Sequence, residues 1–320
     1  MSYTDVDRAG AGIDSAGYET QPDGYKLYVQ RFGPAKPKAL VQLIHGMGEH
    51  SGRYRHVLEA LSAAGYLCII HDHRAMGRSA KRNGIALGAM GGIAGWAYME
   101  KDAVNLASVL KQDYPDLPLA LVAHSMGSFL AQQIMMSAHA QHYDAFILSG
   151  SNGKPSITAR LGHGIIWLQR ALQGRDAKAT WIHKLSFAAL NRRHRPIRTI
   201  HDWLSRDPQA VDAYMSDPLC GYIYTAQGWW ELSQAQFGIA DSRQMKSLVC
   251  DRPIWLFGGA DDGLTSGGKG LRQLYDDWQA LGVKDIKLTL YESARHECFN
   301  ELNRNQVIDD LVAWLDSKML

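Results

Sequence analysis

One serine in this chain follows a short apolar run and precedes a helix-like segment. The run L-A-L-V-A of residues 119–123 ends at H-S-M-G, which contains Ser125, and the helix-like segment S-F-L-A-Q-Q-I-M-M follows. A strand, a sharp turn and a helix in this order are typical of a nucleophile elbow, which exposes a serine hydroxyl in a strained backbone conformation. We therefore take Ser125 as the candidate nucleophile. The alternative is a serine that only caps the helix.

The first position of this elbow departs from the usual pattern G-x-S-x-G, because Ala123 stands there. Small residues are needed at this position, since the backbones of the helix and the strand pass close together. We expect the extra methyl group of alanine to fit.

A serine nucleophile needs a base, and the base needs a group that orients it. Two later apolar runs end in such groups: one leads into G-G-A-D-D-G with Asp261 and Asp262, and the other into E-S-A-R-H with His296. The carboxyl ends of parallel strands meet at one edge of a sheet, so Ser125, one of the two aspartates and His296 are expected to meet. A loop aspartate is usually a turn residue and a lone histidine is usually structural. The order of the three favours the catalytic interpretation.

A tetrahedral intermediate also needs donors for its oxyanion. Met126 comes directly after the candidate nucleophile, so its backbone N–H is one candidate. The H-G-M-G turn after an earlier apolar run offers a second N–H, that of Met47. The alternative is an ordinary strand-to-helix turn whose glycines supply positive φ.

The elements that would position these residues alternate between strand-like and helix-like patterns, which predicts a mostly parallel sheet with helices on both faces. Residues 1–20 are expected to be frayed, and the alternating segment 25–32 to be an outer strand. Further strands are expected over 39–44, 66–70, 119–123, 145–148, 253–257 and 286–291, and helices over 54–64, 97–113, 269–281 and 305–317.

The alternation stops between about residues 152 and 247, where we find helical, aromatic segments and five of the nine tryptophans. We therefore predict a first core part over 22–151, a helical cap over 152–247 and a second core part over 248–320. Such an insertion would cover the nucleophile, and its apolar wall would suit an acyl chain.

The composition excludes several classes of protein. The net charge is +2, with 34 Lys and Arg against 32 Asp and Glu, which argues against a nucleic-acid-binding protein. The polar N-terminus lacks a signal-peptide pattern, and no run reaches the length of a transmembrane helix. No C-x-x-C pair occurs, so we expect reduced thiols and a cytoplasmic protein. The four cysteines are Cys68, Cys220, Cys250 and Cys298.

Other patterns point to competing functions only weakly. The glycines of 46–52 have the spacing G-x-G-x-x-x-G, one residue too long for a dinucleotide turn. His71, Asp72 and His73 are adjacent, so their side chains alternate between faces and do not form a metal site. The basic run 191–198 is best interpreted as a solvated face. The alternative is a transient contact of the cap with anionic lipid head groups. We expect no cofactor and no metal.

Several motifs together resemble the monoacylglycerol lipase and lysophospholipase-like branch of the α/β-hydrolase superfamily, over roughly residues 22–317. The matching pieces are H-G-M-G-E-H-S-G-R-Y (45–54), D-H-R-A-M-G-R-S (72–79), A-H-S-M-G (123–127), D-W-L-S-R-D (202–207), D-P-L-C-G (217–221) and the final G-G-A-D-D-G…R-H-E. The resemblance implies the α/β-hydrolase fold, Ser125 as nucleophile and His296 as general base. It favours Asp262 over Asp261, because family members place the acid nine residues after the proline that starts the strand.

The resemblance also implies a serine hydrolase that cleaves monoacylglycerols, lysophospholipids or simple acyl esters through an acyl-enzyme. The alternatives are acyl transfer, amide or peptide cleavage on the same triad, and a catalytically silent binding protein. Ala75-Met76 stands where the family pattern D-H-x-G-H-G-x-S has Gly-His. This departure near the mouth of the site is expected to alter the shape of the pocket.

Overall fold

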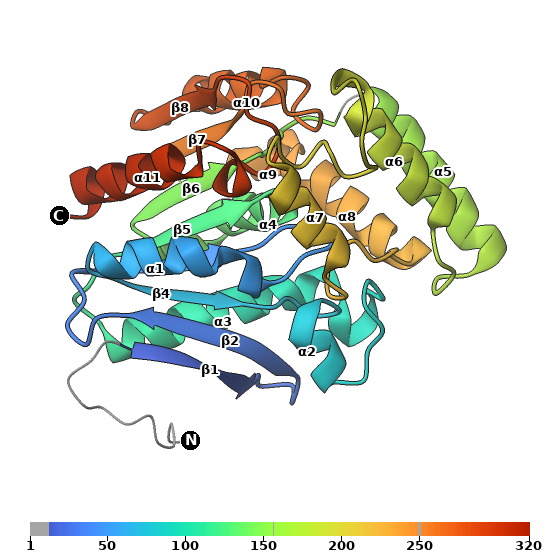
Figure 1. Cartoon of the computed structure of the whole chain (residues 1–320). Coiled ribbons are helices and arrows are strands. Elements are labelled where there is room, and N and C mark those ends of the chain that lie inside the picture. The colour runs from blue at the N-terminus through green and yellow to red at the C-terminus, as the bar shows by residue number, and fades with distance from the viewer. Residues whose placement is uncertain (1–12, 156, 249–250) are drawn as a thin grey trace.

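A computed structural model describes residues 13–155, 157–248 and 251–320. One eight-stranded sheet runs through the molecule in the order β1-β2-β4-β3-β5-β6-β7-β8 (Figure 1). β1 and β2 are antiparallel to their neighbours, and all later pairs are parallel. The strands are β1 (Ile13–Thr20), β2 (Lys26–Gly33), β3 (Ala39–Ile44), β4 (Tyr66–His71), β5 (Leu119–His124), β6 (Ala145–Ser149), β7 (Ile254–Gly259) and β8 (Ile286–Tyr291).

The central strands are apolar along their whole length because both faces of the sheet are covered. Every residue of β3, β4, β5, β6 and β7 is buried. Near-continuous apolar runs are what strands buried on both faces require, which is why the sequence located these five well. The predicted mostly parallel sheet is confirmed.

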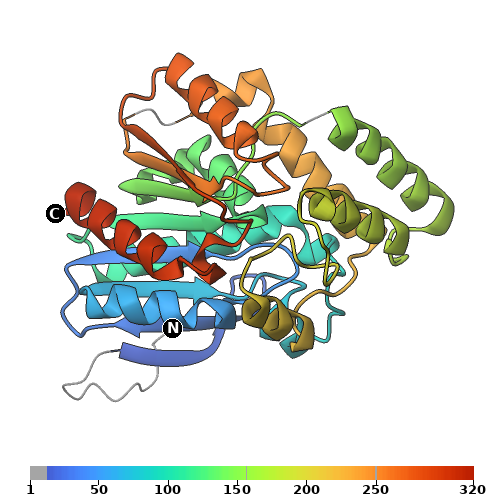
Figure 2. The same ribbon diagram turned by 45° about the horizontal axis from the view of Figure 1, so that its top comes forward.

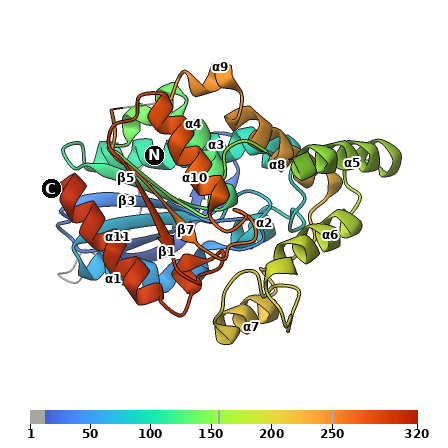
Figure 3. The ribbon, with the colours of Figure 1, turned by 90° about the horizontal axis from the view of Figure 1, so that it is seen from above.

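Helices cover both faces, as the alternating pattern indicated. The core between the sheet and α1 and α11 is separate from the core between the sheet and α3, α4 and α10 (Figures 1 and 3). The helices of the two layers and their connections are α1 (Arg55–Ala63), α2 (Gly77–Arg82), α3 (Trp96–Asp113), α4 (Met126–Met135), α10 (Lys269–Ala280) and α11 (Arg304–Met319). Short 3₁₀ helices span Ser51–Tyr54, Gly92–Ala94, Ala138–His142, Asn191–Arg193 and Cys298–Asn300.

Two expectations for the N-terminal region were wrong. Residues 13–20 form β1 rather than a frayed end, and the segment around 25–32 is β2, which pairs with β1 on one side and with β4 on the other. β1 is an edge strand of small and polar residues, so it pairs through its backbone and shows no apolar alternation. Its one cross-strand aromatic contact joins Tyr18 to Tyr28, with ring centroids 5.6 Å apart. Residues 1–12 lie outside the described part of the chain.

Between β6 and β7 the chain forms an insertion of helices, which projects beyond one end of the sheet (Figure 2). Within the described residues of 152–247 no strand occurs, only a single bridge between Lys178 and Thr225. The helices are α5 (Ile157–Gln173), α6 (Thr180–Leu190), α7 (Pro208–Ser216), α8 (Ala226–Ile239) and α9 (Ser242–Met245). Below, the outer helices are α5 and α6, and the inner segment is residues 201–225.

Cys68, Cys220 and Cys298 are buried and free of disulfides, and Cys250 lies outside the described residues. Among the helices that the structure describes, none is both long enough and apolar enough to cross a bilayer.

Candidate active site

Ser125 occupies a sharp turn between β5 and α4. Its backbone has φ 51° and ψ −120°, a conformation that a residue with a side chain rarely adopts and that stores strain. The helix passes so close to β3 that a Cβ on Gly127 would lie 2.6 Å from the carbonyl oxygen of His45, so only glycine fits there. Ala123 is 1% exposed, and its methyl group is accommodated in the core, as expected.

The loops after β5, β7 and β8 bring three predicted residues together. The hydroxyl oxygen of Ser125 lies 2.8 Å from His296 Nε2, and His296 Nδ1 lies 3.0 Å from Asp262 Oδ2. Because a carboxylate only accepts, Nδ1 donates to Asp262 and Nε2 is left to accept from the serine. The three side chains thus form one line of hydrogen bonds along which a proton can leave the hydroxyl.

The two neighbouring aspartates lie in different surroundings. Asp261 is exposed, whereas Asp262 is fully buried and its second oxygen accepts a hydrogen bond of 2.7 Å from the backbone N–H of Leu264. Asp262 is therefore the one held against His296, which is the assignment that the resemblance favoured.

The charge of the surroundings favours a protonated His296. Burial acts to lower the pKa of His296, but the Asp262 carboxylate, and beyond it Glu297 and Glu49, more than offset this effect, so the pKa is raised. His124, whose ring centroid lies 4.8 Å away, has its pKa lowered to about 4 by burial and by the charge on His296. His124 is consequently a neutral neighbour, and the proton from the serine goes to His296.

The two candidate oxyanion donors flank the serine. Within the described residues, the backbone N–H groups of Met47 and Met126 have no hydrogen-bond acceptor. The loop that carries Met47 packs directly on the elbow, because a Cβ on Gly46 would lie 3.2 Å from the Cβ of Ser125. Two free donors beside a nucleophile are what an oxyanion requires.

A buried ion network that the sequence did not reveal supports these loops. Glu49 accepts from the backbone N–H of Gly46 at 2.6 Å and from Arg53 at 2.7 Å. Arg53 also makes a bidentate pair with Glu297, at 2.5 and 2.6 Å. Arg53 therefore ties the loop that carries Met47 to the loop that carries His296.

The Glu49 carboxylate is held in its charged form. Burial acts to raise the pKa of Glu49, but the charge of Arg53 and the hydrogen bond from the backbone of Gly46 lower it to about 2. Glu49 and Arg53 are four residues apart, a spacing that the sequence shows, although Glu49 precedes the 3₁₀ helix Ser51–Tyr54. The partner of Arg53 that lies 244 residues away was not visible in the sequence.

Ala75 and Met76, which replace the Gly-His of the family pattern, lie close to the loop that carries Met47. Ala75 has φ 59°, a left-handed conformation that favours the glycine of the family pattern. The sulfur of Met76 accepts from the hydroxyl of Tyr224 at 3.3 Å, and that hydroxyl accepts from the N–H of Gly48 at 3.1 Å. Met76 thus contacts the inner segment and, through it, the turn beside the serine.

One group of side chains has the composition of a metal site. His50, Asp217 and Cys220 bring ligand atoms within 4.8 Å of one another. Both ring nitrogens of His50 already have partners, the N–H of Gly52 at 3.1 Å and Asp217 at 2.8 Å. Burial raises the pKa of the Cys220 thiol, which disfavours the thiolate that a metal needs. The hydrogen-bonded pair accounts for this group without an ion.

Residues 35–303 match the family model described as "Serine aminopeptidase, S33". A monoacylglycerol lipase of Mycolicibacterium smegmatis is 29% identical over 287 residues, which cover 88% of this chain and 90% of that relative. A monoglyceride lipase homolog of monkeypox virus is 40% identical over 304 residues, covering 93% of this chain and 96% of that protein. The crystal structure of a carboxyl esterase from Bacillus coagulans in complex with glycerol matches with a TM-score of 0.83 at 22% identity, covering 98% of this chain and 100% of that one, which shows a shared fold.

Proposed function

The chain belongs to the serine aminopeptidase S33 family, has the α/β-hydrolase fold and is a carboxylic ester hydrolase; we propose that it cleaves monoacylglycerols through an acyl-enzyme on Ser125. The observation that carries the proposal is the buried line of hydrogen bonds from Ser125 through His296 to Asp262, with two unpaired backbone N–H groups beside it.

In the first half of the reaction, the Ser125 oxygen attacks the ester carbonyl carbon while its proton passes to His296 Nε2. Asp262 accepts from Nδ1, fixes the tautomer and stabilises the imidazolium. The N–H groups of Met47 and Met126 bind the oxyanion. The C–O bond to the alcohol then breaks, and Nε2 returns the proton to the leaving oxygen.

In the second half, His296 takes a proton from water, and the resulting hydroxide attacks the acyl-enzyme. The bond to Ser125 breaks, its oxygen regains the proton from Nε2, and the fatty acid leaves. No further group is needed to balance either half.

The charges near the serine favour a neutral leaving group. Arg53 is the buried cation on this side of the site, and both Glu49 and Glu297 already neutralise it. A phosphate would meet two carboxylates and no free cation in this network, whereas glycerol hydroxyls carry no charge. This supports monoacylglycerol over lysophospholipid. The names of the relatives from Mycolicibacterium smegmatis and monkeypox virus agree with the choice.

We propose that the segment 152–247 is a cap over the nucleophile and that its outer helices touch lipid surfaces. Large apolar side chains on them are exposed at helical spacing, so they form a stripe. These are Leu161, Ile165, Leu168 and Leu172 on α5 and Trp181 and Leu185 on α6, between 49% and 75% exposed. α5 and α6 lie at the end of the molecule away from the C-terminus (Figure 1).

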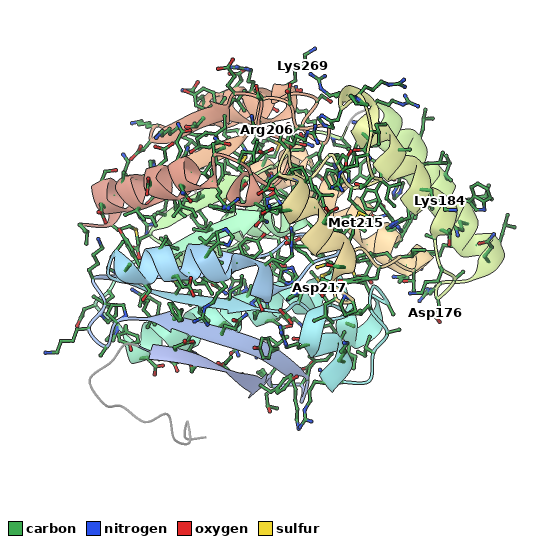
Figure 4. All side chains as sticks on the ribbon, in the orientation of Figure 1. Asp176, Lys184, Arg206, Met215, Asp217 and Lys269 are labelled. Atoms are coloured by element: carbon green, nitrogen blue, oxygen red, sulfur yellow. The ribbon has the colours of Figure 1, made fainter. Side chains whose placement is uncertain are left out.

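The charge of the same region suits an anionic surface. Neither α5 nor α6 contains an aspartate or glutamate, and Lys184 of α6 lies at the outer end of the molecule (Figure 4). The exposed arginines of 191–198 continue the basic character. Apolar anchors beside cations are typical of segments that lie in a membrane interface.

The free thiols of Cys68, Cys220 and Cys298 support the expected cytoplasmic location.

Labelling by a fluorophosphonate and hydrolysis of p-nitrophenyl esters and 1-monoacylglycerols test the chemistry, with Ser125→Ala as control. We expect labelling and turnover that are lost in the variant, and lysophosphatidate turnover at least about 10-fold below that of monoacylglycerol of equal chain length. A folded protein that neither labels nor hydrolyses these esters would overturn the proposal.

Sedimentation with vesicles tests the surface. We expect binding to vesicles that contain phosphatidylglycerol and loss of binding in a Leu168→Glu, Leu172→Glu variant, with p-nitrophenyl butyrate hydrolysis unchanged. Leu302→Glu is the matched control, because Leu302 is 61% exposed but lies far from α5 in the sequence and outside the insertion. Equal binding by both variants would contradict the assignment.

A further inference from the structure

One aromatic residue of the inner segment lies against the base. The ring centroids of Trp203 and His296 are 4.9 Å apart, with the planes at 35°. Trp203 is 7% exposed and belongs to the D-W-L-S-R-D motif, which takes no part in the reaction steps described above. Both nitrogens of His296 are already engaged by Ser125 and Asp262, so the indole contacts the imidazole without competing for a hydrogen bond.

Backbone hydrogen bonds hold the indole in this place. The carbonyl of Trp203 accepts from the N–H of His296 at 3.3 Å, and the carbonyl of Leu204 accepts from the N–H of Glu297 at 2.8 Å. Arg295 donates to the carbonyls of Asp202 and Ser205 at 2.5 and 3.1 Å. The motif therefore runs alongside the loop that carries the base.

Two ion pairs attach the C-terminal end of the D-W-L-S-R-D motif to the segment that follows His296. Arg206 donates to Glu301 through its backbone N–H and its Nε, both at 2.9 Å, and Arg304 pairs with Asp207 at 3.0 Å. Figure 4 places Arg206 between the insertion and the C-terminal part of the core. The indole also stacks on Phe187, with ring centroids 5.5 Å apart and planes at 18°. Trp203 is thus held by its backbone and by a second aromatic ring.

From this geometry we propose, resting on the proposed function, that Trp203 is a positioning residue for the reaction. The indole keeps the His296 ring aligned between Ser125 and Asp262, and its π face stabilises the imidazolium that forms when the serine attacks. A cation within about 6 Å of an indole centroid in a desolvated site is stabilised by the ring quadrupole. The effect exists only while His296 carries the proton, so it lowers the barrier rather than the Michaelis constant.

The other charged or titratable groups that face His296 are Asp262, Glu297 and Glu49, with His124 as a neutral neighbour. The carboxylates also stabilise the imidazolium, and they remain when the indole is removed. A substitution of Trp203 by an apolar side chain therefore isolates the contribution of the ring.

The test compares wild type, Trp203→Phe and Trp203→Leu with p-nitrophenyl butyrate, a substrate that needs no membrane. We expect kcat to fall about 10- to 30-fold in the leucine variant and by a smaller factor in the phenylalanine variant, with KM nearly unchanged. The acidic limb of kcat/KM should move to lower pH in the same order, because a less stable imidazolium loses its proton more easily.

Phe187→Leu is the matched control, because it removes the other ring against Trp203. Its acidic limb should match that of wild type. A fall in kcat of the Trp203 variants with an unmoved acidic limb would mean a merely structural role and would overturn the inference, as would unchanged kinetics. If Trp203→Leu does not fold, the phenylalanine variant decides by the same two readouts.

The failure of this inference is distinct from the failure of the proposed function. A wild-type protein that is folded but neither labels with a fluorophosphonate nor hydrolyses the ester overturns both. An active wild type whose Trp203→Phe and Trp203→Leu profiles coincide with its own overturns only the role of the indole.

Discussion

The two parts of the insertion differ in how they are held. The inner segment buries Trp203, Leu204 and Tyr224 and is bonded to both loops of the site. It accepts from the N–H of His296, and Gly221 donates to the carbonyl of Gly48 at 2.9 Å. The outer helices instead expose their largest apolar side chains, with Leu172 75% and Trp181 74% exposed.

This difference teaches that one insertion serves two physical purposes. Directional hydrogen bonds and close packing are needed where atoms must be positioned for chemistry. Non-directional apolar contact is enough where a helix only has to meet a lipid surface. Changes in the inner part should therefore alter stability and kcat, and changes in the outer part should alter only surface binding.

The largest effect is expected at the ion network that joins the inner segment to the site. Arg53 stacks on Tyr214 of α7, and its loss would leave Glu49 and Glu297 buried without their cation. We expect Arg53→Met to lower the free energy of unfolding by about 3–5 kcal/mol, measured by urea denaturation. Adding Glu297→Gln should recover part of the loss. A decrease in the free energy of unfolding of less than about 1 kcal/mol would mean that this network is no stronger than an exposed ion pair, and would contradict the prediction.

The same substitution in the two parts tests the comparison directly. Leu204 of the inner segment is 3% exposed and Leu172 of α5 is 75% exposed. We expect Leu204→Ala to cost about 2–4 kcal/mol of unfolding free energy and Leu172→Ala less than about 0.5 kcal/mol. Equal costs would show that α5 is packed more tightly than its exposure indicates.

We expect the free energy of unfolding to fall at acid pH, because buried histidines stay neutral in the folded protein and bind protons when it unfolds. Burial lowers the pKa of His71 to about 3 and that of His124 to about 4, against 6.5 in the unfolded chain. The unfolded chain binds more protons below pH 6.5, so stability is complete above that pH and falls as the pH falls. Each histidine costs about 2 kcal/mol between pH 7 and pH 5.

His296 acts in the opposite direction. Its raised pKa contributes stability below the unfolded value, and this contribution is lost as pH rises through the folded value. Because other buried histidines, such as His73 and His183, also have lowered pKa values, we expect a net loss of at least about 2 kcal/mol between pH 7 and pH 5 in urea denaturation, and a shallower slope for His71→Gln. Stability that rises towards pH 5 would contradict the assignment of neutral buried histidines.

The smallest effect is expected at the border between the two parts. Arg198 pairs with Asp212 at 2.6 Å, but the two side chains are 46% and 58% exposed. We expect Arg198→Ala to change the free energy of unfolding by less than about 0.5 kcal/mol, because solvent screens such pairs. Weaker binding to phosphatidylglycerol vesicles, at unchanged stability, would extend the lipid-facing surface to the basic run.

The sequence by itself determined the order of the elements and two residues of the line of hydrogen bonds, Ser125 and His296, and narrowed the third to Asp261 or Asp262. Buried parallel strands are apolar throughout, so β3 to β7 were located from their apolar runs, and Ser125 follows one of them. His296 follows β8, which is only partly buried. β1 was missed because an edge strand of polar residues pairs only through its backbone.

The tertiary structure alone decided which distant side chains share a buried space. Arg53 and Glu297 pair across 244 residues, and Trp203 of the insertion contacts His296 of the second core part. No spacing in the sequence indicates either contact. From the residues alone Asp261 and Asp262 differed by a single position, and burial against His296 separated them in space. Local patterns record periodicity and turns, whereas contacts between loops depend on the path of the whole chain.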